Sequence, residues 1–558
     1  MPDLHLKHWP PGVPHRIAYP DQPVVQNLLT TAARVPDNPA IHYHGATITY
    51  ADLRRDVEAM AGWLRARGVG RGDRVLIHMQ NAPQWVVAYF AIQRANAVVV
   101  PANPMYRHAE LRHLAVDTGA RIALVGSELL DHIRPLLAEG HLDHLAVAAY
   151  ADAADPGSDL PMPEGLGGLT DTGLPGPGVT PWRQALQEGN APPALDTGPE
   201  DLAVIVYSSG TTGHPKGCMH LHRNVMATIE GYTVWTPYTG DDVVLSVMPY
   251  FHVTGMQNSM NVPIRVGAPI VMMSRWDRDV AARLIERFKV TIFRSISTMV
   301  IDLMNAPNFD DYDLSSITNV GCGGAAVPEA VAARLFEMSG LRIIEGYGLS
   351  ETIAATHINP PQAPRKQCLG IPMFEVDSRV LDITTGAELG PGESGEIVMR
   401  GPQIFQGYWR NEAATEQAFV QIEGQRFFRT GDIGHYDADG YWYMTDRVKR
   451  MINASGFKVW PAEVEALMHG HPGIAEACVI GVADPRRGET VKAFVVRRRG
   501  TGETLTEAEI IAWCRAEMAA YKVPRAVTFL DALPKSGSGK VQWRELTEQE
   551  AAAQRASA

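Results

Sequence analysis

The sequence predicts an α/β protein with a large N-terminal domain of parallel α/β sheets, a small β subdomain and a compact α+β C-terminal domain. Between about residues 45 and 350, short runs rich in β-branched residues alternate with helical patterns. Near-continuous apolar strands separated by helices are typical of buried parallel sheets. From 375 to 445 the pattern changes to short strands with Gly turns, which indicates an antiparallel subdomain. The last segment then restarts a pattern of helices and strands.

Eight predicted strands of the large domain follow one another along the chain. The segments between them carry helical periodicity, most clearly at 50–66 and 278–288. The stretch 152–182 is rich in Pro and Gly, so we expect it to be a surface excursion. The strands are RVLIHM (74–79), AVVVPA (97–102), RIALVG (121–126), LAVIVYSS (202–209), DVVLSVMP (242–249), PIVMMS (269–274), VTIFRS (290–295) and LRIIEG (341–346).

The C-terminal domain is expected to follow a short linker. Its pattern predicts a helix at 461–470, strands at ACVIGVAD and KAFVVRRR, and a second helix at 507–520. The predicted organisation is therefore an N-terminal domain at 1–445, a hinge at 446–450 and a C-terminal domain at 451–558.

Composition and charge exclude several classes of protein. The chain of 558 residues is 45% apolar and 20% charged, which is typical of globular proteins and not of disordered or fibrous ones. Its formal net charge of −12 disfavours a general binder of nucleic acid or anionic membranes. Five cysteines without a CxxC pair exclude a disulfide scaffold and a structural zinc site.

The apolar runs bear on where the protein resides. The N-terminal segment MPDLHLKHWPPGVPHRI has no apolar signal region, and prolines interrupt it. The longest apolar runs, such as 85–92, are far shorter than a membrane span. We therefore expect a cytoplasmic protein with no integral membrane segment.

The segment YSSGTTGHPKG, residues 207–217, has the chemistry of a phosphate-binding loop. A buried strand, AVIVY, runs directly into it. Its glycines and hydroxyl residues offer donors that can wrap a polyphosphate, and Lys216 adds a positive charge. It is not a Walker A loop, because no Gly-Lys-Ser/Thr ends it and opens a helix. Loops of this composition are also common without a function, so other motifs must support the hypothesis.

The segments GCGGAAVP and LRIIEGYGLSET are open to a competing interpretation. Gly321, Gly323 and Ala326 follow a strand and precede a helix, and Glu345 ends the next strand. This spacing fits the dinucleotide-binding fingerprint of an NAD(P)-dependent oxidoreductase. Against it, Pro328 makes the helix begin only after the glycines, and Glu345 runs directly into another polar turn.

Further segments carry candidate functional residues. Asp432 lies in the turn of FRTGDIGHYDADGYWYMTDR, where Asp is usually a structural cap. Lys540 lies in the Gly/Ser loop of LPKSGSGKVQWREL, which can place one ammonium in a distant cleft. His252 lies in MPYFHVTGM, where a lone His is more often a core residue. In SGFKVWPAEVE, Pro461 and Glu463 are favourable at a helix start and have no further meaning alone.

Taken together, these motifs resemble the adenylate-forming superfamily, which includes acyl-CoA synthetases, aryl-CoA ligases and the adenylation domains of peptide synthetases. YSSGTTGHPKG is similar to the superfamily's phosphate loop, and the other motifs stand in the superfamily's order. SGFKVWPAEVE looks most like fatty-acyl-CoA ligases. The resemblance covers roughly residues 25–545 and implies that the C-terminal domain is a mobile lid.

The resemblance implies an ATP site built from several motifs. Tyr347 would pack its ring on adenine, and Asp432 would accept hydrogen bonds from both ribose hydroxyls with Arg447 as its partner. The residues implied at the ATP site are Ser208, Ser209, Gly210, Thr211, Thr212, Gly213, Lys216, Gly323, Gly324, Ala325, Glu345, Gly346, Tyr347, Gly348, Ser350, Thr352, Asp432, Arg447 and Lys540.

The same resemblance assigns the catalytic groups. Thr211 and Glu351 would contact Mg²⁺, and a hard cation that bridges ATP phosphates needs only one or two oxygen ligands from the protein. Lys540 would touch the acyl carboxylate and the α-phosphate. Lys449 stands at the hinge position, where the family commonly has Asp and also accepts Lys.

CoA and the acyl chain are expected at other residues. Ser455, Gly456 and Phe457 resemble the turn that approaches the pantetheine thiol. By resemblance, His252 and Met256 line the acyl tunnel. Met256 stands where some long-chain members have a tryptophan gate, which leaves the chain length open.

The implied activity is that of an AMP-forming acyl-CoA synthetase. A medium- or long-chain fatty acid would react with ATP to acyl-AMP and pyrophosphate, and the acyl group would then pass to CoA as the domains alternate. Two alternatives stay open, an aryl-CoA ligase and an adenylate-forming enzyme with a non-CoA acceptor, and the oxidoreductase rests only on 321–345. The expected partners are a small carboxylic acid, ATP and CoA, not nucleic acid. A homodimer is common in relatives, although no self-complementary patch is readable here.

Overall fold

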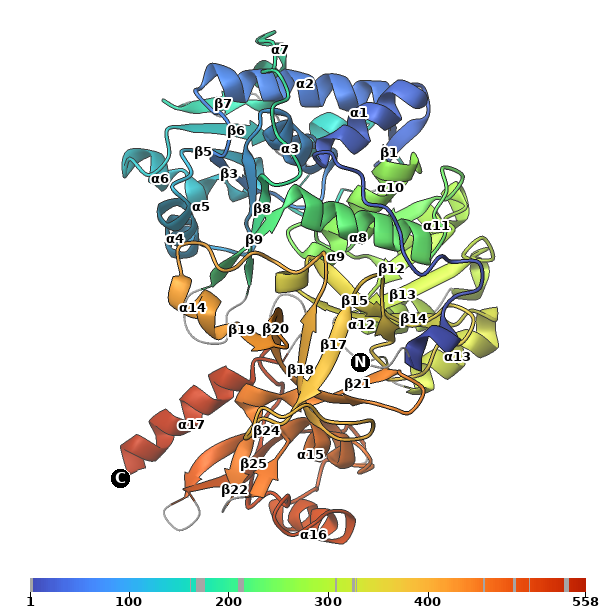
Figure 1. Ribbon diagram of the computed structural model, residues 1–558, viewed down its shortest axis with the longest axis vertical. Coiled ribbons are helices and arrows are strands. Elements are labelled where there is room, and N and C mark those ends of the chain that lie inside the picture. Colours follow the sequence, from blue (N-terminus) through green and yellow to red (C-terminus); the bar gives the residue numbers. More distant parts are fainter. Residues whose placement is uncertain are drawn as a thin grey trace. The chain divides into compact units, whose positions relative to one another are not determined.

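The chain divides into two compact units in the computed structural model (Figure 1). The larger unit comprises Met1–Ser378, Met399–Phe428 and Asp439–Tyr441, and the smaller unit comprises Arg379–Val398, Arg429–Ala438 and Trp442–Ala558. The smaller unit thus includes residues 379–398, 429–438 and 442–445 of the predicted N-terminal domain, and a hinge at 446–450 stays a prediction. The structure describes residues 4–160, 162–166, 176–208, 215–306, 309–323, 327, 329–454, 457–484, 488–500, 502–535 and 541–557.

A seven-stranded sheet forms the first half of the larger unit. Its strands are buried apolar runs and pair in parallel, except that β8 and β9 form an antiparallel hairpin. Edge strand β7 lies inside the stretch that we expected to be a surface excursion. In sheet order the strands are β7 (Val179–Pro181), β6 (His144–Ala148), β5 (Ile122–Gly126), β3 (Arg74–His78), β4 (Val98–Pro101), β8 (Leu202–Ser208) and β9 (Lys216–Leu221).

The second sheet of the larger unit has nine strands. Its centre is parallel, so the carboxyl ends of β12, β13 and β14 meet at one edge, whereas β15, β16 and β2 are antiparallel. The predicted parallel α/β architecture is confirmed, with antiparallel strands at the margins. In sheet order the strands are β16 (Ile371–Pro372), β15 (Ala354–Ile358), β14 (Ile343–Leu349), β13 (Asn319–Gly323), β12 (Ile292–Ser295), β10 (Val244–Ser246), β11 (Ile270–Met272), β1 (Pro39–Tyr43) and β2 (Ala46–Thr49).

Helices pack on these sheets, and their ends follow from local chemistry. Thr49 and Asp52 form a capping box at the start of α2, and Asp277 caps α11 by accepting two backbone N–H bonds. Helix α8 packs on β8 and β9, and its Tyr232 hydroxyl also accepts the N–H of Ala355 in β15, so α8 contacts both sheets (Figure 1). The helices are η1 (Leu4–His8), α1 (Val25–Arg34), α2 (Tyr50–Ala66), α3 (Pro83–Arg94), α4 (His108–Thr118), η2 (Ser127–Leu129), α5 (Leu130–Ile133), α6 (Pro135–Ala138), η3 (Tyr150–Ala153), α7 (Trp182–Gln187), α8 (His222–Trp235), α9 (Val253–Met256), the π-helix η4 (Gln257–Asn261), α10 (Val262–Val266), α11 (Arg278–Phe288), α12 (Ser297–Met304), η5 (Phe309–Asp311), α13 (Glu329–Ser339), η6 (Ser350–Thr352) and α14 (Glu412–Gln417).

Two five-stranded sheets follow in the chain. In the first, β20 pairs antiparallel with β19 and with β21, as the Gly-turn pattern predicts. The second belongs to the smaller unit, where α17 packs on β24 and the helices α15 and α16 pack on β24 and β26. The strands and helices are β17 (Asp377–Leu381), β18 (Gly395–Arg400), β19 (Phe419–Ile422), β20 (Gln425–Tyr436), β21 (Trp442–Arg447), η7 (Val448–Arg450), β22 (Ile452–Ala454), β23 (Phe457–Val459), α15 (Pro461–Met468), β24 (Ile474–Asp484), β25 (Gly488–Arg497), α16 (Glu507–Glu517), β26 (Ala526–Phe529) and α17 (Trp543–Ser557).

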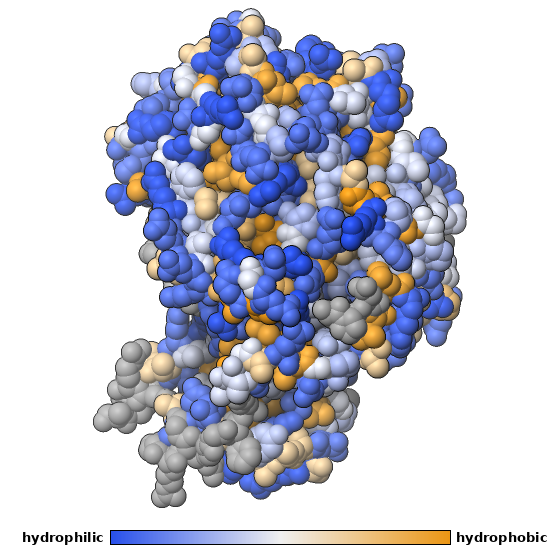
Figure 2. Space-filling model, viewed as in Figure 1, coloured by the Kyte–Doolittle hydropathy of each residue, from blue (hydrophilic) through white to orange (hydrophobic). Residues whose placement is uncertain are grey.

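None of the helices that the structure describes is long and apolar enough to cross a membrane. Figure 2 shows hydrophilic side chains over most of the face in view, with apolar side chains in small patches between them. Small scattered apolar patches are normal for a protein surface and need no ligand to explain them.

Candidate functional site

The carboxylate of Glu351 lies at the carboxyl edge of the nine-stranded sheet, on the turn η6 that follows β14. Its Oε1 accepts a hydrogen bond from the Tyr408 hydroxyl over 2.9 Å. Burial, with the charge of Glu351, raises the pKa of the Tyr408 phenol well above its ordinary value, so the phenol stays a proton donor. The Nζ of Lys216 lies 4.3 Å from the centroid of the same ring. Tyr408 therefore joins the predicted metal ligand to the predicted phosphate-loop lysine.

The segment around Tyr408 is held against β9 by backbone bonds. Cys218 and Tyr408 form an antiparallel bridge, and the N–H of Trp409 donates to the carbonyl of Gly217 over 2.7 Å. The N–H of Phe405 donates to the carbonyl of Glu351 itself over 2.9 Å. The turn η6, β9 and the segment 405–409 thus form one connected support for the Glu351 side chain.

The turn at Glu351 is made of strained backbone. Ile353 has φ +47° and Ala354 has φ +107°, a left-handed region that favours glycine. Gly348 lies at a register shift, and a Cβ there would lie 1.9 Å from the carbonyl oxygen of Ala354. The Thr352 hydroxyl is fully buried and accepts the N–H of Leu349 over 2.8 Å. The predicted nucleotide contacts Gly348 and Thr352 therefore also build the turn that presents Glu351.

The carbonyl of Ser350 is fixed by a buried histidine. His220 Nε2 lies 2.7 Å from the Ser350 oxygen, and only a protonated Nε2 can donate to a carbonyl. Burial lowers the pKa of His220 to about 4, so the ring is neutral near pH 7. His222, at the start of α8, is also fully buried, and burial lowers its pKa to about 3.

Glu345 does not have the free carboxylate that a dinucleotide fingerprint requires. Its two oxygens accept the N–H groups of Val327 over 2.8 Å and Gln367 over 3.0 Å. Burial raises the pKa of Glu345. These backbone donors hold the carboxylate against its own sheet, so it is not the free acid that binds a ribose in a dinucleotide fold.

Two glycines lie side by side at the neighbouring strand ends. Gly323 pairs with Gly346, and among the described atoms none would lie closer than 3.8 Å to a Cβ on Gly323. Tyr347 is buried, and its ring centroid lies 5.8 Å from that of His357. The sequence-predicted residues Gly324 and Ala325 lie outside the described residues.

The predicted phosphate loop stands between β8 and β9 in the chain. Ser208 and Lys216 are register partners at its two ends, and the Ser208 hydroxyl lies 3.4 Å from the Lys216 carbonyl oxygen. Gly217 packs tightly, because a Cβ there would lie 2.6 Å from a methyl of Ile205. The predicted loop residues outside the described residues are Ser209, Gly210, Thr211, Thr212 and Gly213.

Asp432 and Arg447 are brought together in the smaller unit. They are register partners in β20 and β21, and Arg447 Nε lies 3.1 Å from Asp432 Oδ1. The Asp432 side chain is 2% exposed and that of Arg447 42%. The Thr430 hydroxyl accepts the Asp432 N–H over 3.0 Å and donates to the Ile397 carbonyl over 2.7 Å, which fixes the turn.

The predicted hinge residue Lys449 is exposed on η7, but its neighbours in the chain belong to a largely buried polar network. Asp446 accepts the N–H of Ala462 at the start of α15 over 2.6 Å, and burial raises the pKa of this carboxyl. Arg450 donates to Glu465, which also accepts the Val479 N–H over 2.7 Å. An acid and an arginine on either side of Lys449 are the one trace of this network in the sequence.

The predicted CoA and lid residues fall largely on parts of the chain that are not described. Ser455, Gly456 and Lys540 lie outside the described residues, and Phe457 begins β23. Lys535, in the same motif as Lys540, forms an ion pair with Glu476 over 2.6 Å. Their assigned roles stay predictions.

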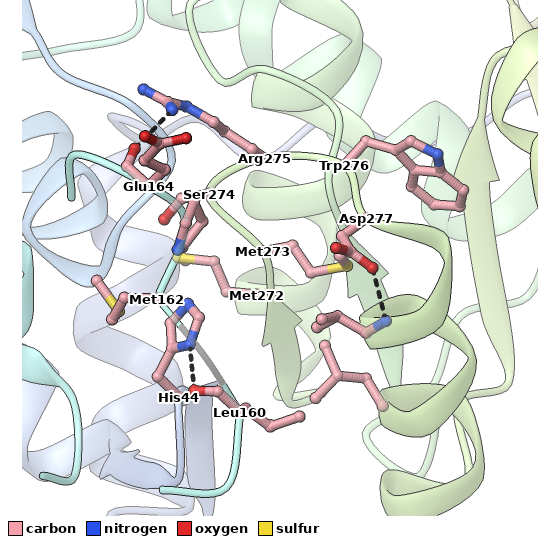
Figure 3. Close-up of a pocket in the computed structure, with 13 residues that line it drawn as sticks. His44, Leu160, Met162, Glu164, Met272, Met273, Ser274, Arg275, Trp276 and Asp277 are labelled. Atoms are coloured by element: carbon pink, nitrogen blue, oxygen red, sulfur yellow. Dashed lines mark hydrogen bonds between the residues drawn. The ribbon is translucent and has the colours of Figure 1, made fainter. Parts of the chain in front are cut away.

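The predicted acyl-pocket residues begin an irregular helix. His252 precedes α9, and Met256, fully buried, ends it where the π-helix η4 begins. The cavity of Figure 3, of about 330 Å³, lies elsewhere, between β11 and the loop at 160–164. Met162, Met272 and Met273 line it, and neither His252 nor Met256 does.

Comparison with known proteins identifies the family. The family model "AMP-binding enzyme" matches residues 28–409, and "AMP-binding enzyme C-terminal domain" matches residues 463–540. The chain belongs to the AMP-binding enzyme family. The predicted membership of the adenylate-forming superfamily, in its acyl-CoA synthetase branch, is confirmed, and with it the reaction class of an AMP-forming acid–thiol ligase that uses ATP and CoA.

Similar proteins of this family match over nearly their whole length. The long-chain-fatty-acid–CoA ligase of Bacillus subtilis is 34% identical over 98% of each chain, and the feruloyl-CoA synthase of an Amycolatopsis species is 33% identical over 91% of this chain and 94% of its own. The crystal structure of ATP-bound MatB from Rhodopseudomonas palustris superposes with a TM-score of 0.83, at 28% identity, over 95% of this chain and 99% of that chain.

Proposed function

We propose that this AMP-binding enzyme activates an aliphatic, medium- or long-chain carboxylic acid with ATP and transfers the acyl group to CoA. The observation that carries the proposal is that Tyr408 contacts both Glu351, through its hydroxyl, and Lys216, through its ring. Lys216 stands at one end of the predicted phosphate loop. Long-chain-fatty-acid–CoA ligases from several bacteria, 31–34% identical over 98% of the chain, support the choice of an aliphatic acid.

In the first half-reaction, an oxygen of the acid bonds to the α-phosphorus of ATP, and the bond to pyrophosphate breaks. Lys216 and the loop N–H groups would hold the phosphates, and Asp432 would hold the ribose through its two oxygens. Negative charge builds on the α-phosphoryl oxygens, and we assign Lys540 to stabilise it. Pyrophosphate leaves and acyl-AMP stays bound.

The residues present fit one divalent cation. Glu351 is a half-buried carboxylate whose bond from Tyr408 leaves acceptor positions open, and Mg²⁺ bound with ATP phosphates needs only one or two protein oxygens. Glu351 and Thr211 would hold the ion, which would neutralise phosphate charge. Among the described residues no cluster of three or more metal-ligating side chains occurs, which suits an ion held mainly by its nucleotide.

In the second half-reaction, the CoA thiol attacks the acyl carbonyl, a thioester forms, and AMP leaves with the bonding electrons. We propose that the C-terminal domain pivots at Lys449 between the two steps. Lys540 would then leave the site, and the turn at Ser455, Gly456 and Phe457 would guide the thiol.

Release of pyrophosphate tests the proposal. We expect pyrophosphate release with aliphatic acids in the range C8–C18. When CoA is present, we expect the same acids to be converted to thioesters. Preference for aromatic acids would instead favour an aryl-CoA ligase, the alternative that the feruloyl-CoA synthase at 33% identity supports. Pyrophosphate release without thioester would point to an acceptor other than CoA, and no release with any acid would contradict the proposal.

A further inference from the structure

Arg294 is a buried positive charge with no anionic partner among the residues that the structure describes. It lies on β12 and is 8% exposed. Its Nε donates to the Tyr238 hydroxyl over 2.9 Å. Its guanidinium carbon also lies 5.6 Å from the centroid of the Tyr238 ring. Among the described residues, the bond to Tyr238 is the one side-chain hydrogen bond that the guanidinium makes, and it forms no ion pair. Burying a charge without a partner is costly, so such a group in a folded enzyme needs an explanation.

The guanidinium lies over the strand ends at which we place the substrate. Arg294 is the register partner of Gly321, and a Cβ on Gly321 would lie 2.1 Å from the Arg294 Nη1. Side chains two residues apart on a strand share a face, so Gly323 lies on the same face as Gly321. No described atom would lie closer than 3.8 Å to a Cβ on Gly323, and Glu351 follows the next strand of the sheet. In α/β sheets, ligands bind outside the carboxyl ends of parallel strands.

Polar side chains continue from Arg294 to the predicted acyl pocket. Tyr232 lies between Arg294 and Asn258. Burial raises the pKa of Tyr232, whereas a hydrogen bond from Asn258 and the nearby charge of Arg294 both lower it. Asn258 is 4% exposed, its Oδ1 has no hydrogen-bond partner, and it stands on the π-helix that begins directly after Met256. Gln257 and Ser259 on the same helix also bury polar atoms without a partner. A pocket built only for a hydrocarbon chain would not keep these groups.

We infer that the acid substrate carries a second carboxylate on its chain and that Arg294 binds it. This inference rests on the proposed function, because it concerns the acid that is activated. A guanidinium and a carboxylate make two parallel hydrogen bonds, and Arg is the residue best suited to such a pair in a buried site. Arg294 is thus a specificity-determining residue, and Tyr238 is the positioning residue that fixes its Nε.

The test compares acids of equal chain length. Pyrophosphate release is measured with monocarboxylic and α,ω-dicarboxylic acids from C4 to C16. The proteins compared are the wild type, Arg294→Met and a control, Arg334→Met. Arg334 lies on the exposed side of α13. For the best diacid we expect wild-type kcat/KM at least tenfold above that of the monoacid of the same length. Arg294→Met should lower kcat/KM for the diacid about 100-fold and leave the monoacid within about threefold. Arg334→Met should change neither.

Two further measurements keep the outcome decisive. If Arg294→Met does not fold, Tyr238→Phe, which removes only the hydroxyl that accepts the Nε–H, should lower kcat/KM for the diacid about tenfold and spare the monoacid. Wild-type release with monoacids only, or an equal loss of both activities in Arg294→Met, would overturn this inference and leave the proposed function intact. Absence of release with every acid would overturn the proposed function itself.

Discussion

The hydroxyl of Tyr408 donates to the carboxylate of Glu351 over 2.9 Å, although 57 residues separate them in the chain. The segment that carries Tyr408 is tied to β9, the strand that leaves the phosphate loop, and the ring also faces Lys216. One aromatic residue thus sets the distance between the two charged groups that we assign to the phosphates and their metal.

Removing this hydroxyl should impair adenylation. In Tyr408→Phe the ring stays over Lys216, but Glu351 loses its donor and the orientation that goes with it. A hydrogen bond to a charged group is worth about 1.5–3 kcal/mol, so we expect kcat/KM for pyrophosphate release to fall about 10- to 100-fold. Tyr521→Phe, at a ring 37% exposed in the smaller unit, serves as the control and should be silent. Equal activity of Tyr408→Phe and the wild type would remove Tyr408 from the site.

The Asp432–Arg447 pair should act on ATP and not on the acid. Asp432→Asn keeps the size of the side chain but takes away one acceptor and the charge that pairs with Arg447 over 3.1 Å. We expect the KM for ATP to rise at least tenfold, while the KM for the acid changes by less than about threefold. In Arg447→Met the same direction with a smaller effect is expected, because this side chain is 42% exposed. A rise in both KM values would mean that the pair supports the fold and not the nucleotide.

Glu128 should make stability depend on pH. Burial raises its pKa from the ordinary value of 4.5 to about 7, although the Tyr150 hydroxyl donates to its Oε1 over 2.9 Å. The folded state therefore holds the proton more tightly than the unfolded state. The stability that this gives is full below about pH 4.5 and is lost as the pH rises through about 7, by up to about 3 kcal/mol.

The substitution Glu128→Gln should abolish this dependence. The apparent unfolding temperature of the variant, relative to the wild type, is expected to rise between pH 5 and pH 8. Glu200→Gln, at an acid that is 67% exposed, should show no such change. The same pH dependence in Glu128→Gln and the wild type would assign the effect to other groups.

A rigid residue at the hinge should separate the two half-reactions. Lys449→Pro fixes φ at one backbone angle, whereas Lys449→Ala leaves the backbone free and controls for loss of the side chain. We expect Lys449→Pro to release pyrophosphate in a single turnover nearly as the wild type does, but to form thioester at least tenfold more slowly. Thioester formation at the wild-type rate in Lys449→Pro would locate the pivot at another residue.

Much of the fold could be predicted because most central strands are apolar runs, whereas β12 contains Arg294 and β13 is rich in glycine. The pairing of the edge strands could not be predicted, because the local sequence pattern does not show which strand another strand pairs with. Strand β9 folds back on β8, and β7 reaches the sheet edge from a Pro/Gly-rich stretch. The division into units was also not readable, because it cuts through strands such as β20 and not through a linker.

The motifs pointed to the charged residues that we place in the site but not to the residues that hold them. Glu351 stands in a recognisable motif, whereas Tyr408 lies in an unremarkable segment and reaches Glu351 only through tertiary structure. Arg294 was overlooked, although a charge inside the apolar run VTIFRS was a readable signal. The polar π-helix after Met256 could not be predicted, because its backbone type has no simple sequence pattern.

The most direct test of the account is the separation of the half-reactions in Lys540→Ala. Pyrophosphate release from acid and ATP, and thioester formation from supplied acyl-AMP and CoA, are measured side by side. Lys535→Ala, which removes the partner of Glu476 from the same motif, is the control and should keep both activities. In Lys540→Ala we expect the rate of pyrophosphate release to fall at least 100-fold, while thioester forms from acyl-AMP at close to the wild-type rate. An equal loss of both activities would contradict the account.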